Sequence, residues 1–174
     1  MSNPITIKKK INNFNKKIEV SGDKSLSIRW ILFSSIANGK SVAKNLLKSE
    51  DVLAAISAIK KLGIKSKFEK DKCIIYGRGV DGYKYKKNIT INAKNSGTLG
   101  RLILGLLINT ENKIKIIGDK SLSKRDFKRV TKPLEKFGAS FKLKNKKFLP
   151  LEIQGSKFLK PISYFEKKGS AQCK

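Results

Sequence analysis

The chain has 174 residues and a formal net charge of +27, from 40 basic and 13 acidic side chains. Two cysteines and no histidine exclude the usual zinc ligand sets and a disulfide framework. Only five of the cations are arginine, while lysine is spread along the chain with isoleucine and asparagine. This distribution favours compositional drift over a nucleic-acid-binding face. Because no apolar run reaches membrane-spanning length and no signal-peptide core is present, we expect a cytoplasmic protein.

The first informative segment is residues 21–29, S-G-D-K-S-L-S-I-R, which leads from a strand-like run into a helical one. A turn that opens a helix presents unpaired N–H groups and the positive end of the helix dipole. Lys24, Ser25 and Arg29 would add an ammonium, a hydroxyl and a guanidinium, so the segment could hold a phosphate or carboxylate. The equal alternative is an ordinary N-cap, closed by Asp23 or Ser25, with solvated cations.

Two helical patterns, at 51–63 and 126–138, both begin with Asp and end with Gly, as expected of a capped helix. Pro133, inside the second pattern, predicts a kink or a late helix start. In chain order, the first set of elements is a strand at 18–20, a helix at 29–37, a strand at 41–46, a helix at 51–63 and strands at 64–68 and 73–76. The second set is a strand at 89–91, a helix at 99–108, a strand at 113–117, a helix at 126–138 and strands at 139–143 and 149–153.

The order β-α-β-α-β-β therefore occurs twice, at 18–88 and at 89–161, after an N-terminal segment at 1–17. A third unit begins at 162–174, with a strand at 162–165 and a small polar turn. A strand and a turn without their helix cannot bury an apolar face, so we expect a piece of a longer protein. The fold class is α/β, built from α+β repeats.

Three turns occupy the same place in their repeats, between the end of a strand and the start of a helix. If the repeats pack around an axis, these turns could meet at one anion site. In the alternative interpretation they are caps in separate places. The side chains that would converge are Lys24, Ser25, Asn95, Thr98, Ser170 and Gln172.

Five motifs resemble the 5-enolpyruvylshikimate-3-phosphate (EPSP) synthase family, in its order and spacing. They are G-D-K-S-L-S-I-R, N-S-G-T-L-G-R, G-D-K-S-L-S-K-R, L-P-L-E-I-Q-G and S-A-Q-C-K, at 22–29, 95–101, 118–125, 149–155 and 170–174. The sister family of UDP-N-acetylglucosamine enolpyruvyl transferases has Asn where Ser25 stands. The resemblance implies repeats packed around a pseudo-threefold axis, as in one lobe of the enolpyruvyl transferase fold, with the third unit incomplete here.

The resemblance also implies the reaction, in which the enolpyruvyl group of phosphoenolpyruvate is transferred to shikimate 3-phosphate in the shikimate pathway of aromatic amino-acid biosynthesis. It implies a transferase that uses no cofactor or metal and acts as a monomer, without nucleic acid or membrane partners. Family members are more than twice as long and have a second lobe, which carries the acid–base residues. We therefore expect this chain to supply anion binding without catalysis, and its strand at 5–9 to pair with that second lobe.

Site roles follow from the resemblance position by position. The substrate-binding residues would be Lys24, Ser25, Arg29, Gly97, Arg125, Ser170, Ala171 and Gln172, with Asn95 and Thr98 secondary and Arg101 supporting the fold. Two positions depart from the family pattern. Ile28 stands where the family usually has His or Asn, and Asp126 replaces the usual Pro, where it could compete with an anion or cap the helix. Gly97 is the form that predicts inhibition of a full-length version by glyphosate.

Two other functions remain open from the residues alone. The first is a small-anion binder without catalysis. The second, less favoured, is a basic RNA-binding module, since no recognised RNA motif is present and aromatic residues do not alternate with basic ones.

Overall fold

The computed structural model describes residues 6, 8–10, 13, 15, 17–166 and 169. The N-terminal strand expected at 5–9 lies largely outside the described residues, as do Ser170, Ala171 and Gln172. The first repeat contains helices α1 (Lys24–Ile36) and α2 (Glu50–Lys61) and strands β1 (Asn38–Lys44), β2 (Lys65–Glu69) and β3 (Lys72–Arg78). The second contains α3 (Gly97–Leu106), the 3-10 turn η1 (Leu122–Lys124), α4 (Lys128–Lys136) and strands β4 (Ile89–Asn92), β5 (Ile114–Ile117), β6 (Ser140–Lys144) and β7 (Phe148–Gln154).

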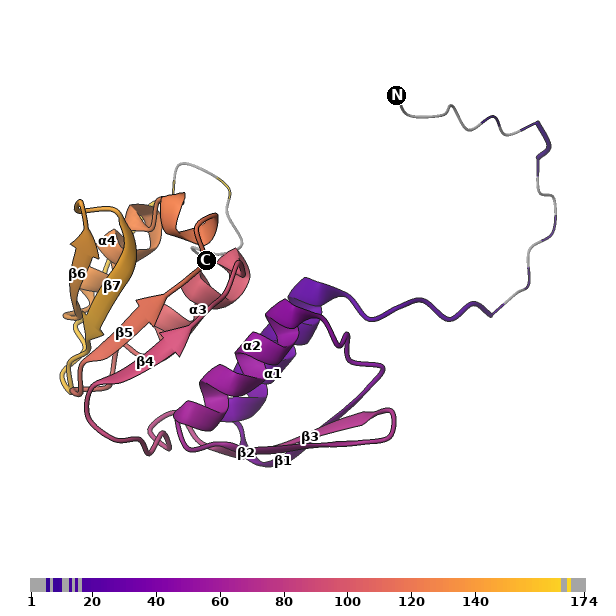
Figure 1. Cartoon of the computed structure of the whole chain (residues 1–174), viewed down its shortest axis with the longest axis horizontal. Coiled ribbons are helices and arrows are strands. Elements are labelled where there is room, and N and C mark those ends of the chain that lie inside the picture. Colours follow the sequence, from indigo (N-terminus) through magenta and orange to yellow (C-terminus); the bar gives the residue numbers. More distant parts are fainter. Residues whose placement is uncertain are drawn as a thin grey trace.

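Each repeat forms a sheet with its own helices (Figure 1). The first sheet has the order β1-β3-β2 and is antiparallel. The second has the order β4-β5-β7-β6, in which β4 and β5 are parallel and the others antiparallel. The mixed α/β architecture confirms the predicted fold class, and β1, β2 and β3 correspond to β5, β6 and β7.

The two repeats share one hydrophobic core. Helix α1 packs against α2 and β3, and α3 contacts both α1 and α2. The fully buried side chains include Ile31 of α1, Ile59 of α2, Ile75 of β3 and Leu99 of α3. All four belong to one continuous cluster that also includes side chains of the second sheet. This packing brings the start of α3 beside the first repeat, which matters for the site.

The predicted strand at 18–20 is wrong. Ile18 and Val20 are each 71% exposed and belong to no strand. The carbonyl of Val20 accepts a hydrogen bond from Asn45 Nδ2 at 2.8 Å, in place of a backbone ladder. Alternating apolar residues form a strand only when a neighbouring strand pairs with them, and none does so in the described part of the chain.

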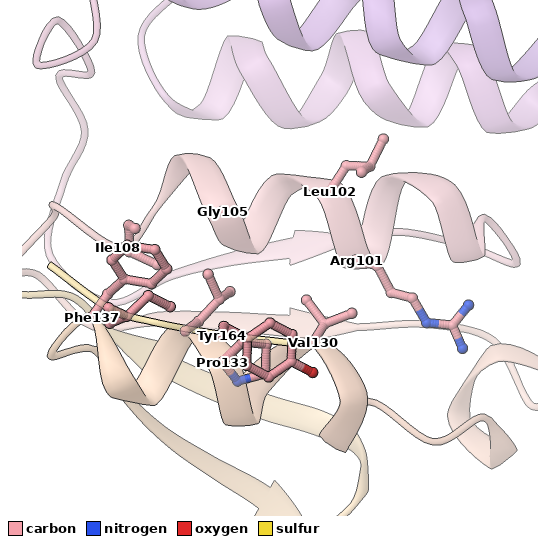
Figure 2. A pocket seen from close by; sticks show the side chains of 10 residues that line it. Arg101, Leu102, Gly105, Ile108, Val130, Pro133, Phe137 and Tyr164 are labelled. Carbon is pink, nitrogen blue, oxygen red and sulfur yellow. The ribbon is translucent and has the colours of Figure 1, made fainter. Parts of the chain in front are cut away.

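The predicted strand at 162–165 is also wrong, since 161–166 has no regular secondary structure. Ile162 and Tyr164 instead line an apolar groove of about 450 Å³ between α3 and α4. Lys136 Nζ lies 5.5 Å from the centre of the Tyr164 ring. Figure 2 shows Tyr164 beside Pro133 and Val130 in this groove.

The late helix start predicted at Pro133 does not occur, and the alternative, a kink, stays a prediction. Helix α4 begins at Lys128, two residues after Asp126, and Pro133 lies inside it. No helix among the described residues is long and apolar enough to cross a membrane.

Candidate functional site at the helix N-termini

Asp23 determines where α1 begins. Its Oδ1 accepts a hydrogen bond from the Leu26 N–H at 2.7 Å, while its own backbone is extended. The N-cap predicted for Asp23 is therefore confirmed. Lys24 and Ser25 are then the first residues of the helix, and Arg29 Nη1 donates to the Ser25 carbonyl at 3.3 Å. The cap and an anion site do not compete, because the cap uses Asp23 and leaves Lys24 and Arg29 beside the first turn.

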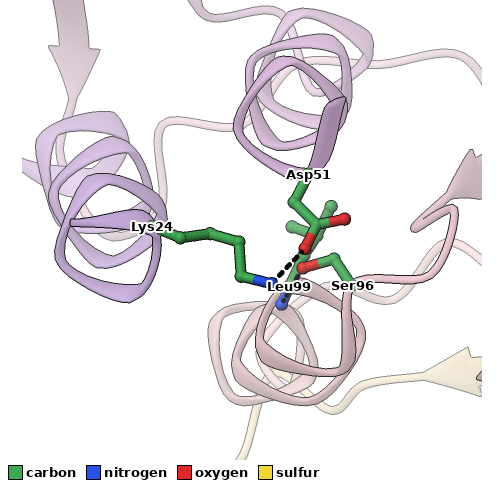
Figure 3. A network of polar contacts seen from close by, with 4 residues as sticks. All are labelled: Lys24, Asp51, Ser96 and Leu99. Atoms are coloured by element: carbon green, nitrogen blue, oxygen red, sulfur yellow. Dashed lines mark hydrogen bonds and ion pairs between the residues drawn. The ribbon is translucent and has the colours of Figure 1, made fainter. Parts of the chain in front are cut away.

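Lys24 is paired with a carboxylate from the next helix. Its Nζ lies 3.0 Å from Asp51 Oδ2 in the first turn of α2. The Asp51 side chain is only 8% exposed, whereas that of Lys24 is 53% exposed. Figure 3 shows Lys24, Asp51 and the Ser96 N-cap of α3 pointing toward one another from three helices. The start of α2 therefore fixes where the Lys24 ammonium lies.

The same turn of α2 also contacts the second repeat. Glu50 Oε1 lies 3.6 Å from Lys94 Nζ, just before α3. Ser96 caps α3 by accepting the Leu99 N–H at 3.2 Å. The predicted turns at the start of α1 and at the start of α3 therefore meet across the first turn of α2. The third predicted turn, near the end of the chain, falls outside the described residues apart from Gly169.

Gly97 lies against two guanidinium groups. A β-carbon at Gly97 would lie 2.9 Å from Arg125 Nη1 and 3.2 Å from Arg101 Nη1. Arg101 is 7% exposed, and its Nη2 donates to the Asp126 carbonyl at 3.2 Å. Its guanidinium also lies 5.3 Å from the centre of the Phe127 ring. Arg101 supports the fold, as predicted, and in addition it faces Gly97.

The remaining predicted residues take less central places. Asn95 is exposed in the turn before α3, and Thr98 is half-buried in the first turn of that helix. Ile28 is fully buried in the core, so the position that departs from the family pattern serves packing. Asp126 Oδ1 accepts the Lys128 N–H at 2.6 Å, which favours the capping alternative.

Asp51 and Glu50 were missed as site residues. The sequence did mark Asp51 as the first residue of a repeated helical pattern, but only the structure shows that its partner is Lys24. The described residues contain no group of three or more cysteine, aspartate or glutamate side chains that could hold a metal ion.

Comparison with known proteins identifies the family. The profile of EPSP synthase (3-phosphoshikimate 1-carboxyvinyltransferase) matches residues 8–174. The chain belongs to the EPSP synthase family. Proteins named 3-phosphoshikimate 1-carboxyvinyltransferase from Streptococcus pyogenes serotype M2 (strain MGAS10270) and serotype M49 (strain NZ131) are each 41% identical over 158 residues. These alignments cover 90% of this chain but only 36% and 37% of the relatives.

A solved EPSP synthase from Acinetobacter baumannii has a similar structure. Its TM-score is 0.83 at 36% sequence identity, over 91% of this chain and 36% of that one. The similarity supports the assignment of the fold to part of a lobe of the EPSP synthase structure. The chain thus spans little more than a third of the length of its relatives.

Proposed function

We propose that this chain is the anion-binding part of an enzyme that transfers the enolpyruvyl group of phosphoenolpyruvate to shikimate 3-phosphate. The observation that carries the proposal is the meeting of the α1, α2 and α3 N-termini around Lys24. Family membership and the names of the relatives supply the substrates. In the family chemistry both substrates are anions, and helix N-termini with cationic side chains are suited to bind them.

Lys24, Ser25 and Arg29 would bind the phosphate of shikimate 3-phosphate. All three lie in the first two turns of α1, whose first turn has no acidic residue. Asp51 acts on Lys24 and would orient its ammonium toward the ligand. Since Asp51 is nearly buried and Lys24 is half exposed, the ammonium keeps an open side for the substrate.

Gly97 and Arg125 would bind phosphoenolpyruvate. Arginine can donate two parallel hydrogen bonds to a phosphate or carboxylate, and Gly97 leaves the space that the Arg125 guanidinium occupies. Ser170, Ala171 and Gln172 would complete the substrate contacts, and Asn95 and Thr98 would be secondary. Because Gly97 carries no methyl group, we also propose that the full-length enzyme is inhibited by glyphosate.

The reaction forms a bond between a hydroxyl oxygen of shikimate 3-phosphate and C2 of phosphoenolpyruvate, and breaks the bond from C2 to the phosphate oxygen. A proton is added to the methylene carbon and later removed, and the attacking hydroxyl loses its proton. The described residues contain cations that can stabilise the phosphate groups. The groups that move protons would belong to the remainder of the protein, so we propose that this chain alone gives no turnover.

Isothermal calorimetry with shikimate 3-phosphate tests the proposal. We expect saturable binding that falls at least about 10-fold in Lys24→Ala, because a hydrogen bond to a charged group is lost. The matched control is Lys44→Ala, which removes an exposed lysine from β1. Equal loss in both variants would contradict the proposal. A steep dependence on salt with no preference for the sugar phosphate over RNA would instead indicate nucleic-acid binding.

A further inference from the structure

A cationic hollow lies between α3 and the beginning of α4, beside the site formed by Lys24 and Gly97. It has a volume of about 680 Å³. Its lining residues are Arg101, Arg125, Asp126, Lys128, Arg129 and Lys132. Five of these six side chains are cations and one is a carboxylate, so the lining carries a formal charge of +4.

The kind of cation in this hollow is informative. The chain has five arginines among its 40 basic residues, and three of the five line this one hollow. Scattered lysines follow from composition, but composition does not gather the few arginines in one place. Arginine is the side chain suited to paired hydrogen bonds with phosphate oxygens.

The charge at the start of α4 is the reverse of what a helix prefers. The first turn of α2 carries Glu50 and Asp51, and its last turn carries Lys60 and Lys61, which matches the helix dipole. The first turn of α4 carries no acidic residue and begins with Lys128 and Arg129. The nearby Asp126 carboxylate already accepts the Lys128 N–H at 2.6 Å. A bound anion would correct this unfavourable arrangement.

Arg101 is held in place among the other cations. It is 7% exposed and is fixed by the Asp126 carbonyl at 3.2 Å and by the Phe127 ring. Figure 2 shows its guanidinium extending away from the apolar groove of α3 and α4. It therefore lines the cationic hollow and cannot swing into solvent, as an exposed lysine could.

We propose that this hollow is a second anion site, which binds a phosphate dianion through Arg101, Arg129, Lys128 and Lys132. It adjoins the site at Gly97 through Arg125, which borders both. The inference does not depend on the identity of the substrates proposed above, because it rests on the lining of the hollow and on the charges of α4.

The test is a titration of the chain with inorganic phosphate, at fixed ionic strength in chloride, followed by NMR of the backbone amides and by calorimetry. We expect a saturable response of the amides of Lys128, Arg129 and Val130. Arg129→Gln and Lys132→Gln should each weaken binding about 10-fold. Both side chains are exposed, so these variants should fold. The matched control is Arg78→Gln on β3, which should not change this response. Lys24→Ala on α1 is measured beside it, to show whether the phosphate binds at α1 instead.

Three results would overturn the inference. The first is no response of these amides to phosphate, and the second is equal weakening by Arg78→Gln. The third is a response lost in Lys24→Ala but retained in Arg129→Gln and Lys132→Gln. That last result would place the phosphate at α1 and leave the proposed function intact. Conversely, the chain could fail to bind shikimate 3-phosphate while the amides of α4 still respond to inorganic phosphate. That result would contradict only the proposed function.

Discussion

The sequence G-D-K-S-L-S-x-R occurs twice in this chain, at 22–29 and 118–125, and its two copies have different structures. Both copies begin in the same way. Asp23 Oδ1 accepts the Leu26 N–H at 2.7 Å, and Asp119 Oδ1 accepts the Leu122 N–H at 2.7 Å. The first copy continues as the 13-residue helix α1, while the second ends after the three-residue turn η1. The motif therefore sets the cap and not the length of the helix.

The residues that follow each copy explain the difference. After the first copy, Ile31 and Leu32 continue the buried face of α1. After the second, Phe127 is fully buried and its N–H donates to the Lys147 carbonyl at 2.9 Å, which draws the chain away from a helical path. As a result Arg29 stays against its own helix, whereas Arg125 is extended and reaches Gly97. The two copies of the motif thus place their arginines differently, one against α1 and the other beside Gly97.

The largest expected contrast concerns the glycines that open the two copies. A β-carbon at Gly22 would lie 2.3 Å from the Asn45 carbonyl oxygen and 2.8 Å from the Leu47 nitrogen, both backbone atoms. At Gly118 the nearest atom would be Leu122 Cδ2, at 2.7 Å. Backbone cannot move as a side chain can, so Gly22→Ala should lower the free energy of unfolding by about 3 kcal/mol and Gly118→Ala by about 1 kcal/mol. Urea unfolding measures both, and equal losses would contradict the explanation.

The next contrast concerns the acidic residues that open the two helical patterns. Asp51 is nearly buried and paired with Lys24, while Asp126 is exposed and accepts one N–H. Asp51→Asn should cost about 2 kcal/mol, since it removes the ion pair and a favourable charge at the start of α2. Asp126→Asn should cost about 0.5 kcal/mol, because the amide oxygen can still accept the bond.

A double-mutant cycle of Asp51→Asn with Lys24→Ala checks the cause of the larger loss. If the ion pair is responsible, the second substitution should cost little once the first is present. Fully additive losses would show that the two side chains act independently and would remove the support for Asp51 as the residue that orients Lys24.

The caps themselves should behave alike. Asp23→Ala and Asp119→Ala each remove one hydrogen bond of 2.7 Å to a backbone N–H, so each should cost about 1 kcal/mol. Asn at either position should restore most of the loss. A much larger cost at Asp23 would mean that the cap also determines how far α1 extends, against the explanation from downstream residues.

Local features of this fold were predictable from the sequence. Helical spacing with Asp before it and Gly after it located α2 and α4, and alternation located β2, β3, β6 and β7. These patterns depend on neighbours in the chain. The strand expected at 18–20 does not form, because a strand needs, beyond its local pattern, a pairing strand that is distant in sequence.

The site was predictable only in part. Lys24 could be singled out because the turns repeat, and Arg29 because it follows the first of these turns. The family resemblance gave Gly97 and the role of each residue. The pairing of Lys24 with Asp51 and the approach of Arg125 to Gly97 join residues that are far apart in the chain. Such contacts are set by the packing of α1, α2 and α3, which no local pattern contains. The concentration of arginines near α4 became visible only with that packing.

The smallest expected effect concerns the segment between β3 and β4, in which Tyr83 contacts α1. The Tyr83 hydroxyl lies 2.7 Å from Ser35 Oγ. Burial raises the pKa of Tyr83 above 10.0, although the Ser35 hydrogen bond acts in the other direction. The folded state then holds the phenolic proton more tightly than the unfolded state does. This contribution to stability is complete below pH 10 and is lost as the pH rises through the folded-state pKa.

Tyr83→Phe should cost about 0.5 kcal/mol at neutral pH through the lost hydrogen bond, and it should reduce the fall in stability above pH 10. Urea unfolding across pH 8 to about 11 measures both effects. Tyr76→Phe is the matched control, because Tyr76 is 37% exposed on β3. If the two variants keep the same alkaline slope, the buried Tyr83 hydroxyl is not the cause of the loss of stability above pH 10.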